Sequence, residues 1–510
     1  MKKLPYKTYE DAKKKFNWSD RWLLFDGNSN QLNLTHECID RHIDSGLENT
    51  IAARVMQPNG NCTEMSFSQL HSLTNQYARV MQSQGVKFGD RIAVRLDASL
   101  DFIAVMFATF RLGAIFVPCS TLLGSEALFA RINDAKPIMT ITSSADDISE
   151  LNESGNKLTL ENLIEMSKSV TDNRLECEST SAKDPAIYAY SSGTTGIPKR
   201  TVLQHQAFTY LTVIVGVFVL GLEQDDRYMT CYTPGYLAGF GWGILVPMSL
   251  GTAAGIIAGK FEPKKFLKAI QDQKFTALHC PPTAYKKLLQ AHSGDKLKIL
   301  KLGYTAEAMD LALAEQIEEV FGSYARGHYG ATEIGMVAVD YAFPDYQTRP
   351  GAMGKPLFCS DVAVLDDEGI RLNAGIQGRI ALFKSNKALF SGDFGLWDDD
   401  GYLVYRGRAN DVIITSGFTI GASEIEECLR NHPDVQQAAV IAFEDLERGH
   451  VPKAFVQLRK SESHGTEQLQ IELKDHVRKK LGKYAYPKFI VFVNEFELNE
   501  AGKIRKTLLS

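Results

Sequence analysis

Residues 90–119 read DRIAVRLDASLDFIAVMFATFRLGAIFVPC. A short apolar run (DRIAVRL) is followed by a helix-length stretch (DFIAVMFATFRLG) and a second apolar run (AIFVPC). This order predicts a right-handed βαβ unit in a parallel sheet. The alternation continues to about residue 400, with strands expected at IMTITS from Ile138 and ALHCPP from Ala277, and helices at PKKFLKAIQDQ from Pro263 and LALAEQIEEVFG from Leu311. We therefore predict an α/β fold whose sheets are covered by helices.

The pattern changes near Gly407. GYLVYRGRANDVIITSG predicts strand, turn and strand, and SEIEECLRNHP predicts a helix with Ser423 as its N-cap. Two strands (AAVIAFED, KAFVQLRK), a helix (IELKDHVRKKLG) and a strand near FIVFVNEF follow. We predict a large N-terminal domain, residues 1–408, and a small mobile α+β domain, residues 409–510.

Composition excludes several classes of protein. The formal net charge of −5 favours neither nucleic acid nor an anionic membrane. The basic start, MKKLPYKTYEDAKKKF, lacks the apolar run of a secretory signal, and the eight cysteines form no CxxC pair. The uncharged stretch from Tyr228 to Gly259 contains two prolines and many glycines, so buried structure is favoured over a membrane span. We expect a cytoplasmic monomer or homodimer.

The segment AIYAYSSGTTGIPKR, residues 186–200, predicts a phosphate-binding loop after a strand. Glycines let a backbone approach an anion, hydroxyls donate hydrogen bonds, and a lysine adds positive charge. The candidate residues are Ser191, Ser192, Gly193, Thr194, Thr195, Gly196 and Lys199. The spacing differs from the GxxxxGK[ST] loop of ordinary NTPases. On composition alone, a polar surface turn remains an equal interpretation.

The whole loop resembles the STGTTGxPKG-like signature of the adenylate-forming superfamily, which includes acyl-CoA synthetases, adenylation domains of peptide synthetases and luciferases. Further family motifs follow in order: TAEAM from Thr305, HYGATEIG from His328, SGDFG from Ser391, YRGRANDVIITSG from Tyr405 and AGKIRK from Ala501. The resemblance covers nearly the entire chain. It implies an AMP-forming acid–CoA ligase that uses ATP, Mg²⁺ and CoA.

The resemblance also assigns roles to residues of the large domain. Thr305, Ala306 and Glu307 would lie along adenine, and the motif that contains Tyr329 and Gly330 would stack on it. Thr332 would contact the α-phosphate, Glu333 would hold Mg²⁺, and Asp393 and Arg408 would bind the nucleotide. A lone glutamate in a loop is ordinarily just solvated, so these roles rest on the resemblance.

Three residues near and beyond the boundary receive roles in the same way. Lys503 would enter the site as the catalytic lysine during adenylation, although a lysine near a chain end is ordinarily an exposed charge. Asn410 would be the hinge about which the small domain swings. Gly417 would then line a tunnel for the thiol arm of CoA.

The segment YTPGYLAGFGWG, residues 232–243, bears on the acid. It resembles the GWxxG segment of acetyl- and medium-chain acyl-CoA synthetases and lacks the acidic residue that amino-acid-activating relatives carry. The resemblance places an open acyl pocket at Tyr236, Leu237, Phe240, Tyr304 and Gly330, with Trp242 nearby, although each apolar side chain is individually more typical of core packing. It implies a medium-chain, branched or aromatic acid. A ligase that loads a separate carrier protein and a luciferase-like oxygenase remain alternatives.

Overall fold

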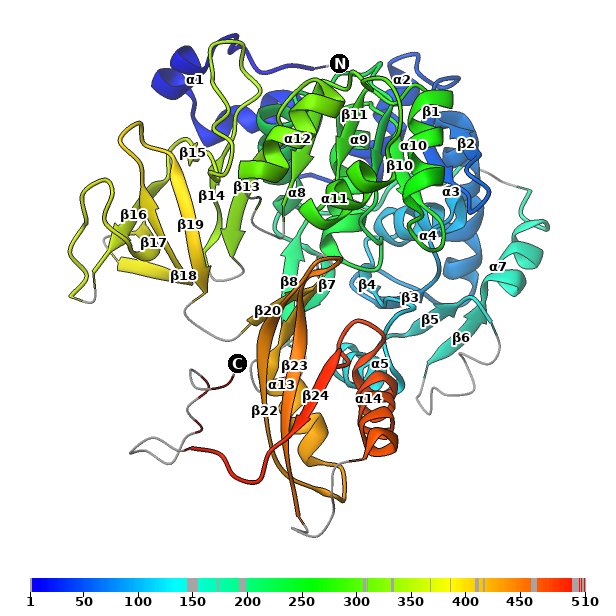
Figure 1. Ribbon diagram of the computed structural model, residues 1–510. Helices are drawn as coiled ribbons and strands as arrows, with labels where there is room; N and C mark the ends of the chain where they lie inside the picture. Colours follow the sequence, from blue (N-terminus) through cyan, green and yellow to red (C-terminus); the bar gives the residue numbers. More distant parts are fainter. Residues whose placement is uncertain are drawn as a thin grey trace.

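A computed structural model gives the fold of the chain, with a large domain above a small one in the view of Figure 1. The structure describes residues 2–144, 155–171, 174–191, 199–305, 309, 311–331, 334–366, 368–385, 387–408, 412–415, 418–459, 466–497, 504, 506 and 509.

The first sheet of the large domain contains the quoted βαβ unit. Its order, within the described residues, is β6 (Asn156–Thr159), β5 (Met139–Thr142), β3 (Arg91–Arg95), β4 (Ile115–Pro118), β7 (Pro185–Ser191) and β8 (Lys199–Gln204). All neighbours are parallel except β7 and β8, which form an antiparallel pair. Helix α4 (Leu100–Arg111) packs on β3 and β4 and against α3 (Phe67–Ser83), while α7 (Leu160–Ser167) contacts β6.

The second sheet of the large domain also consists mainly of parallel strands. Its order in the described chain is β15 (Lys355–Pro356), β14 (Gly335–Val339), β13 (Arg326–Ala331), β12 (Lys301–Tyr304), β11 (Ala277–His279) and β9 (Tyr228–Thr230). The four strands from β9 to β13 are parallel. One face packs against α10 (Pro263–Asp272), α11 (Pro282–Ala291) and α12 (Leu311–Phe321), and the other against π-helical segments at Thr212–Val219 and Ala238–Leu245. A parallel sheet covered on both faces explains why its strands are nearly continuous apolar runs.

Two further sheets complete the large domain. Strand β1 (Ile51–Met56) lies between β10 (Ala254–Ile257) and β2 (Cys62–Ser66). An antiparallel sheet of β16 (Asp361–Leu365), β17 (Gly378–Lys384), β18 (Lys387–Trp397) and β19 (Leu403–Arg408) leads to the small domain. The other helices are α1 (Tyr9–Lys15), α2 (Arg41–Asp44), α5 (Ser125–Ala135), α8 (Ala207–Leu211) and α9 (Val246–Ser249).

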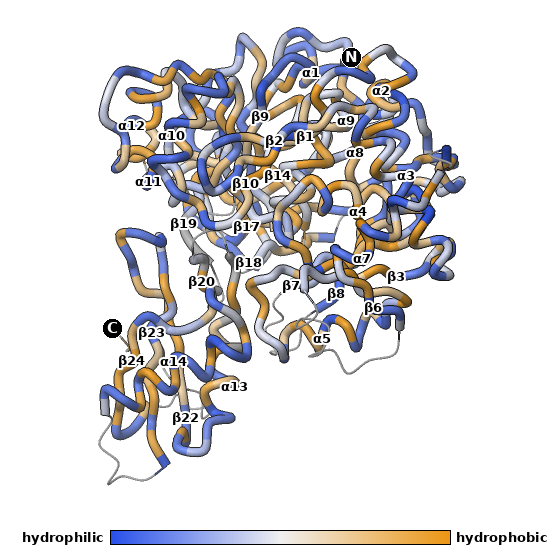
Figure 2. Tube along the Cα trace, turned by 90° about the vertical axis from the view of Figure 1, so that its right-hand side faces the viewer, coloured by the Kyte–Doolittle hydropathy of each residue, from blue (hydrophilic) through white to orange (hydrophobic). Residues whose placement is uncertain are grey.

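The small domain has a core of its own. Its sheet contains β20 (Val412–Thr415), β21 (Phe418–Gly421), β22 (Val435–Asp445), β23 (Gly449–Leu458) and β24 (Phe489–Phe492), with β24 parallel to β23. Helices α13 (Ala422–Arg430) and α14 (Glu467–Leu481) pack against each other and cover one face. Figure 2 shows orange, apolar stretches along these strands, in keeping with continuous runs such as AAVIAF in β22 and FIVF in β24.

The expected α/β class, with a large N-terminal and a small C-terminal domain, is confirmed. The expected strands and helices coincide with β3, α4, β4, β5, α10, β11 and α12. The N-cap prediction is wrong, because α13 begins at Ala422 and Ser423 lies within its first turn. Strand β21 ends at Gly421 and the helix begins at the next residue, so Ser423 does not precede the helix and cannot be its N-cap. The exact boundary at residue 408 stays a prediction, since residues 409–411 lie outside the described chain.

The uncharged stretch from Tyr228 to Gly259 is buried structure of the large domain. It forms β9, the π-helical segment Ala238–Leu245, α9 and β10. Among the described residues, the helices are too short or too polar to cross a membrane. All eight cysteines are described and none is in a disulfide.

Candidate active site

The candidate site lies where parallel strands of the second sheet end. His279 ends β11, Tyr304 ends β12, and Tyr329 lies in β13, next to β12. In open α/β sheets, ligands bind outside the carboxyl ends of the strands. The sheet therefore brings predicted nucleotide and acid residues, far apart in sequence, to one edge.

Tyr329 and Asp393 form the clearest contact at this edge. The Tyr329 hydroxyl donates a hydrogen bond of 2.6 Å to Oδ2 of Asp393, and both side chains are buried. Burial and the neighbouring carboxylate raise the pKa of Tyr329 well above its ordinary value, so its hydroxyl keeps its proton. Asp393 on β18 is also paired in register with Arg408 on β19. Tyr329 and Asp393, both predicted to bind the nucleotide, are therefore in side-chain contact. Arg408, a third predicted nucleotide residue, lies opposite Asp393 on the adjacent strand.

Thr305 is held against the same edge. Its Oγ1 donates to the His328 carbonyl at 3.1 Å, and its amide lies 3.3 Å from the Tyr232 hydroxyl, which itself donates to the Thr305 carbonyl at 3.0 Å. Thr305, where the segment predicted to lie along adenine begins, is therefore hydrogen-bonded to β13 and to Tyr232, the second residue after β9.

The two ends of the predicted phosphate loop also meet. Ser191, the last residue of β7, pairs in register with Lys199, the first residue of β8. Seven residues, 192–198, connect them and lie outside the described chain. A strand-to-strand connection of this kind places Lys199 beside the start of the loop, as a lysine that binds a phosphate would need.

Several predicted residues lie outside the part of the chain that the structure describes. They are Ser192, Gly193, Thr194, Thr195, Gly196, Ala306, Glu307, Thr332, Glu333, Asn410, Gly417 and Lys503. Their roles stay predictions. Among the described residues there is no group of three or more His, Cys, Asp or Glu side chains that could hold a metal ion.

The predicted acid residues occupy different environments. Tyr236 and Leu237 are half-buried, whereas Phe240 is fully buried and packs edge-to-face on Phe116 of β4. Tyr304 is buried and donates to the Ala352 carbonyl at 3.2 Å. A Cβ added at Gly330 would lie 2.5 Å from the Gly335 carbonyl oxygen, so the β13–β14 hairpin also requires a glycine there.

Comparison with known proteins identifies the family. A family model described as AMP-binding enzyme matches residues 47–391, and one described as AMP-binding enzyme C-terminal domain matches residues 424–503. The chain belongs to the AMP-binding enzyme family.

Relatives of this AMP-binding enzyme include acyl-CoA synthetases. Acetyl-coenzyme A synthetase of Bacillus subtilis is 27% identical, covering 99% of this chain and 94% of that protein. Human mitochondrial acyl-coenzyme A synthetase ACSM4 is 29% identical, covering 88% and 84%. The crystal structure of Brucella canis acyl-CoA synthetase is similar with a TM-score of 0.73 at 26% identity, covering 99% and 98%. The predicted AMP-forming acid–CoA ligase chemistry, and with it the use of ATP and CoA, is confirmed by these relatives.

This AMP-binding enzyme also has a buried histidine pair at the candidate site, which the sequence did not predict. Nε2 of His279 lies 3.2 Å from Nε2 of His328, and the two rings are nearly parallel. The Trp242 ring stands across both, at 80° and 81°, and Tyr232 packs beside it. The signal was a histidine inside each of two otherwise apolar strand sequences, ALHCPP and GHYGA. Only the sheet shows that the two lie together.

The histidine pair is neutral at pH 7. Burial lowers the pKa of His328 to about 3 and that of His279 well below its ordinary value. Nδ1 of His279 and Nε1 of Trp242 are buried and have no hydrogen-bond partner among the described residues. An uncharged polar group could pair with them, whereas a carboxylate would find no positive charge on these rings.

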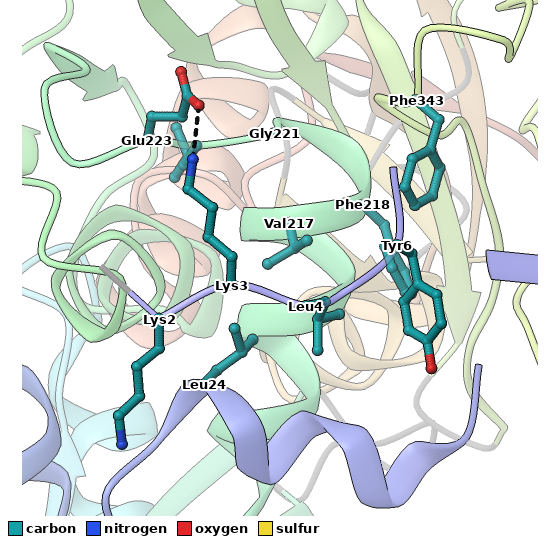
Figure 3. A pocket seen from close by; sticks show the side chains of 11 residues that line it. Lys2, Lys3, Leu4, Tyr6, Leu24, Val217, Phe218, Gly221, Glu223 and Phe343 are labelled. Carbon is teal, nitrogen blue, oxygen red and sulfur yellow. Dashed lines mark hydrogen bonds and ion pairs between the residues drawn. The ribbon is translucent and has the colours of Figure 1, made fainter. Parts of the chain in front are cut away.

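A separate cavity of about 150 Å³ lies under the N-terminal segment (Figure 3). Lys3 and Glu223 form an ion pair of 3.2 Å across its rim, while Leu4, Val217 and Phe218 supply apolar walls. None of the predicted site residues lines this cavity. It does not belong to the candidate active site.

Proposed function

We propose that this AMP-binding enzyme activates a medium-chain, branched or aromatic carboxylic acid and transfers it to CoA. In the first half-reaction, a carboxylate oxygen attacks the α-phosphorus of ATP, the bond to the bridging oxygen breaks, and pyrophosphate leaves. In the second, the sulfur of CoA attacks the acyl carbon and AMP leaves. The product is an acyl-CoA thioester.

The observation that carries the proposal is the contact between Tyr329 and Asp393. These residues lie 64 positions apart and meet by a 2.6 Å hydrogen bond beside Thr305. An aromatic ring next to a carboxylate suits a nucleoside, because the ring can stack on the base and the carboxylate can accept hydrogen bonds from ribose hydroxyls. Both residues belong to motifs through which the chain resembles the family, and this supports the proposal.

Lys199 and the proposed residues outside the described chain supply charge where the reaction requires it. The attack joins two anions, so positioning and charge neutralisation matter more than proton transfer. We assign Lys199 and the hydroxyls of the loop to the β- and γ-phosphates, Thr332 to the α-phosphate and Lys503 to the reacting carboxylate. Mg²⁺ on Glu333 would neutralise phosphate oxygens, which are the ligands this hard cation prefers.

The acid is proposed to carry no second charge. The half-buried Tyr236 and Leu237 and the ring of Trp242 offer mainly apolar surface. The neutral histidine pair offers polar atoms without positive charge. A dicarboxylic acid would have to bury its second carboxylate unpaired, which is strongly unfavourable.

A pyrophosphate-release screen tests the proposal. Purified enzyme with ATP and Mg²⁺ is assayed against octanoate, isovalerate, benzoate, acetate and succinate, with and without CoA. We expect release with at least one of the first three acids, acyl-CoA formation only when CoA is present, and the weakest turnover with succinate. Selective use of acetate or succinate would refute the acid class. Adenylation with no transfer to CoA would refute the acceptor and favour a carrier protein.

A further inference from the structure

The two domains meet through the end of α14 and the start of α5. In the described chain, helix α14 of the small domain packs against helix α5 of the large domain (Figure 1). Lys480 Nζ lies 3.1 Å from Oε1 of Glu126. The contact joins residues 479–482 of the small domain to residues 122–126 of the large one.

Two glycines make this contact close enough for backbone to meet backbone. A Cβ added at Gly124 would lie 2.2 Å from the Lys479 carbonyl oxygen and 2.8 Å from that of Lys480. A Cβ at Gly482 would lie 2.4 Å from the Leu122 carbonyl oxygen. Neither distance is compatible with a side chain, because the obstacles are backbone atoms. The close approach of the two backbones in this arrangement of the domains therefore requires a glycine at both positions.

The contact also reaches the predicted acid pocket. The ring of Tyr484, two residues after Gly482, stands edge-on to the ring of Tyr236 with centroids 6.2 Å apart. Tyr236 is the first residue predicted to line the pocket. The docked small domain thus contributes an aromatic side chain beside the place where the acid is proposed to bind.

The segment next to Lys503 lies on the other face of the small-domain sheet. Ile504 packs with Ala439 and Phe455, whereas α13 and α14 cover the face formed by alternate residues such as Ala438 and Val456. Successive residues of a strand point to opposite faces. The helix that docks on the large domain and the segment that adjoins the proposed adenylation lysine are therefore on opposite sides of the sheet.

We propose that Gly124, Gly482 and Tyr484 are positioning residues that dock the small domain for the CoA half-reaction. The inference rests on the proposed function, because that function assigns adenylation to Lys503. In this pose Ile504, the residue after Lys503, lies on the face of the sheet opposite the helix that contacts the large domain. Tyr484 covers the acyl group in this pose and leaves it when the small domain moves.

Gly124→Ser is the discriminating variant. Gly124 is the N-cap of α5 and has φ −72° and ψ 163°, a conformation open to any residue, and it makes no side-chain cap. Serine is a better N-cap than glycine, so the substitution does not weaken the helix. Its Cβ still collides with Lys479. Gly482, at φ +109°, is a poorer test because any side chain there is strained in every pose.

The half-reactions of the variant are measured separately. We expect pyrophosphate release in the presence of hydroxylamine to stay within about twofold of wild type, and thioester formation from supplied octanoyl-AMP or benzoyl-AMP to fall at least about tenfold. Glu126→Gln, which removes only the half-exposed ion pair, is the control and should change either rate less than about twofold. Equal loss of both half-reactions in Gly124→Ser, or loss of neither, would overturn the proposal.

A structural readout separates this inference from the proposed function. A carbodiimide couples a lysine to a carboxylate only when they touch, so it should join Lys480 to Glu126 in the wild-type chain, and the joined peptide is detected by mass spectrometry. Gly124→Ser should lose this product even if no tested acid is turned over. Its persistence in the variant would show that the pose does not depend on Gly124.

Discussion

At the residue scale, the proposed nucleotide site includes the buried carboxylate of Asp393. Asp393 is buried, its amide donates to Ser391 Oγ at 3.0 Å, and Oδ2 accepts from Tyr329. Asp393→Ala should raise the KM for ATP by about ten- to a hundredfold, as expected when a charged hydrogen-bond acceptor is removed. The measurement is pyrophosphate release against ATP concentration. The KM for the acid should change little, and a loss confined to the acid would contradict the assignment.

The buried side chain of His205 makes the stability of the fold depend on pH. Both of its ring nitrogens are buried without a partner in the described structure, and burial lowers the pKa of the ring to about 3. The unfolded chain binds a proton at about pH 6.5. Above that pH the ring is neutral in both the folded and the unfolded chain, so its titration does not change the free energy of unfolding. As the pH falls from about 6.5 towards 3, only the unfolded chain gains the proton, and the folded protein becomes less stable.

His205→Phe removes this titration and keeps an aromatic ring next to Phe110, which lies 6.1 Å away. We expect the variant to be more stable than wild type by about 1 kcal/mol at pH 7, since two unpaired polar atoms disappear. Its advantage should grow between pH 6.5 and pH 4.5. Thermal unfolding across this range measures both effects, and an advantage that stays constant with pH would refute the linkage.

At the scale of elements, the proposed acid site lies where neighbouring strands of the second sheet end. His279 and His328 come from β11 and β13, and β12 lies between these strands. Gly303 on β12 makes room for the pair, because a Cβ there would lie 2.6 Å from Cδ2 of His279. Sequence alone predicted β11 from its apolar run ALHCPP, and it gave no prediction for β12 or β13. It did not predict the pair, because strand order and register are properties of the sheet.

The acid preference should respond to this pair. His328→Leu replaces a neutral polar ring with an apolar side chain and leaves Nε2 of His279 without its partner. We expect kcat/KM to change by at least about tenfold between octanoate and a hydroxylated acid of the same length, in favour of octanoate. The KM for ATP serves as the internal control and should stay within about twofold. Equal effects on both acids would indicate a structural role alone.

At the scale of the whole molecule, we propose that the reaction is divided between two domain positions. Lys503→Ala should abolish acid-dependent pyrophosphate release and spare thioester formation from supplied acyl-adenylate, because the lysine is assigned to the first half-reaction alone. Gly124→Ser should show the opposite division. Rapid-quench assays of each half-reaction make the comparison. If both variants lost the same step, the two-position scheme would be wrong.

The sequence by itself determined the fold class and the family chemistry, and it predicted the nucleotide residues. These depend on local information: alternating apolar runs predict strands and helices, and a loop such as residues 191–199 carries its chemistry in consecutive residues. Only the tertiary structure decided which distant residues touch. The Tyr329–Asp393 bond, the His279–His328 pair and the Gly124–Lys479 contact join separate elements, because packing and strand order, rather than sequence spacing, set the distance between them.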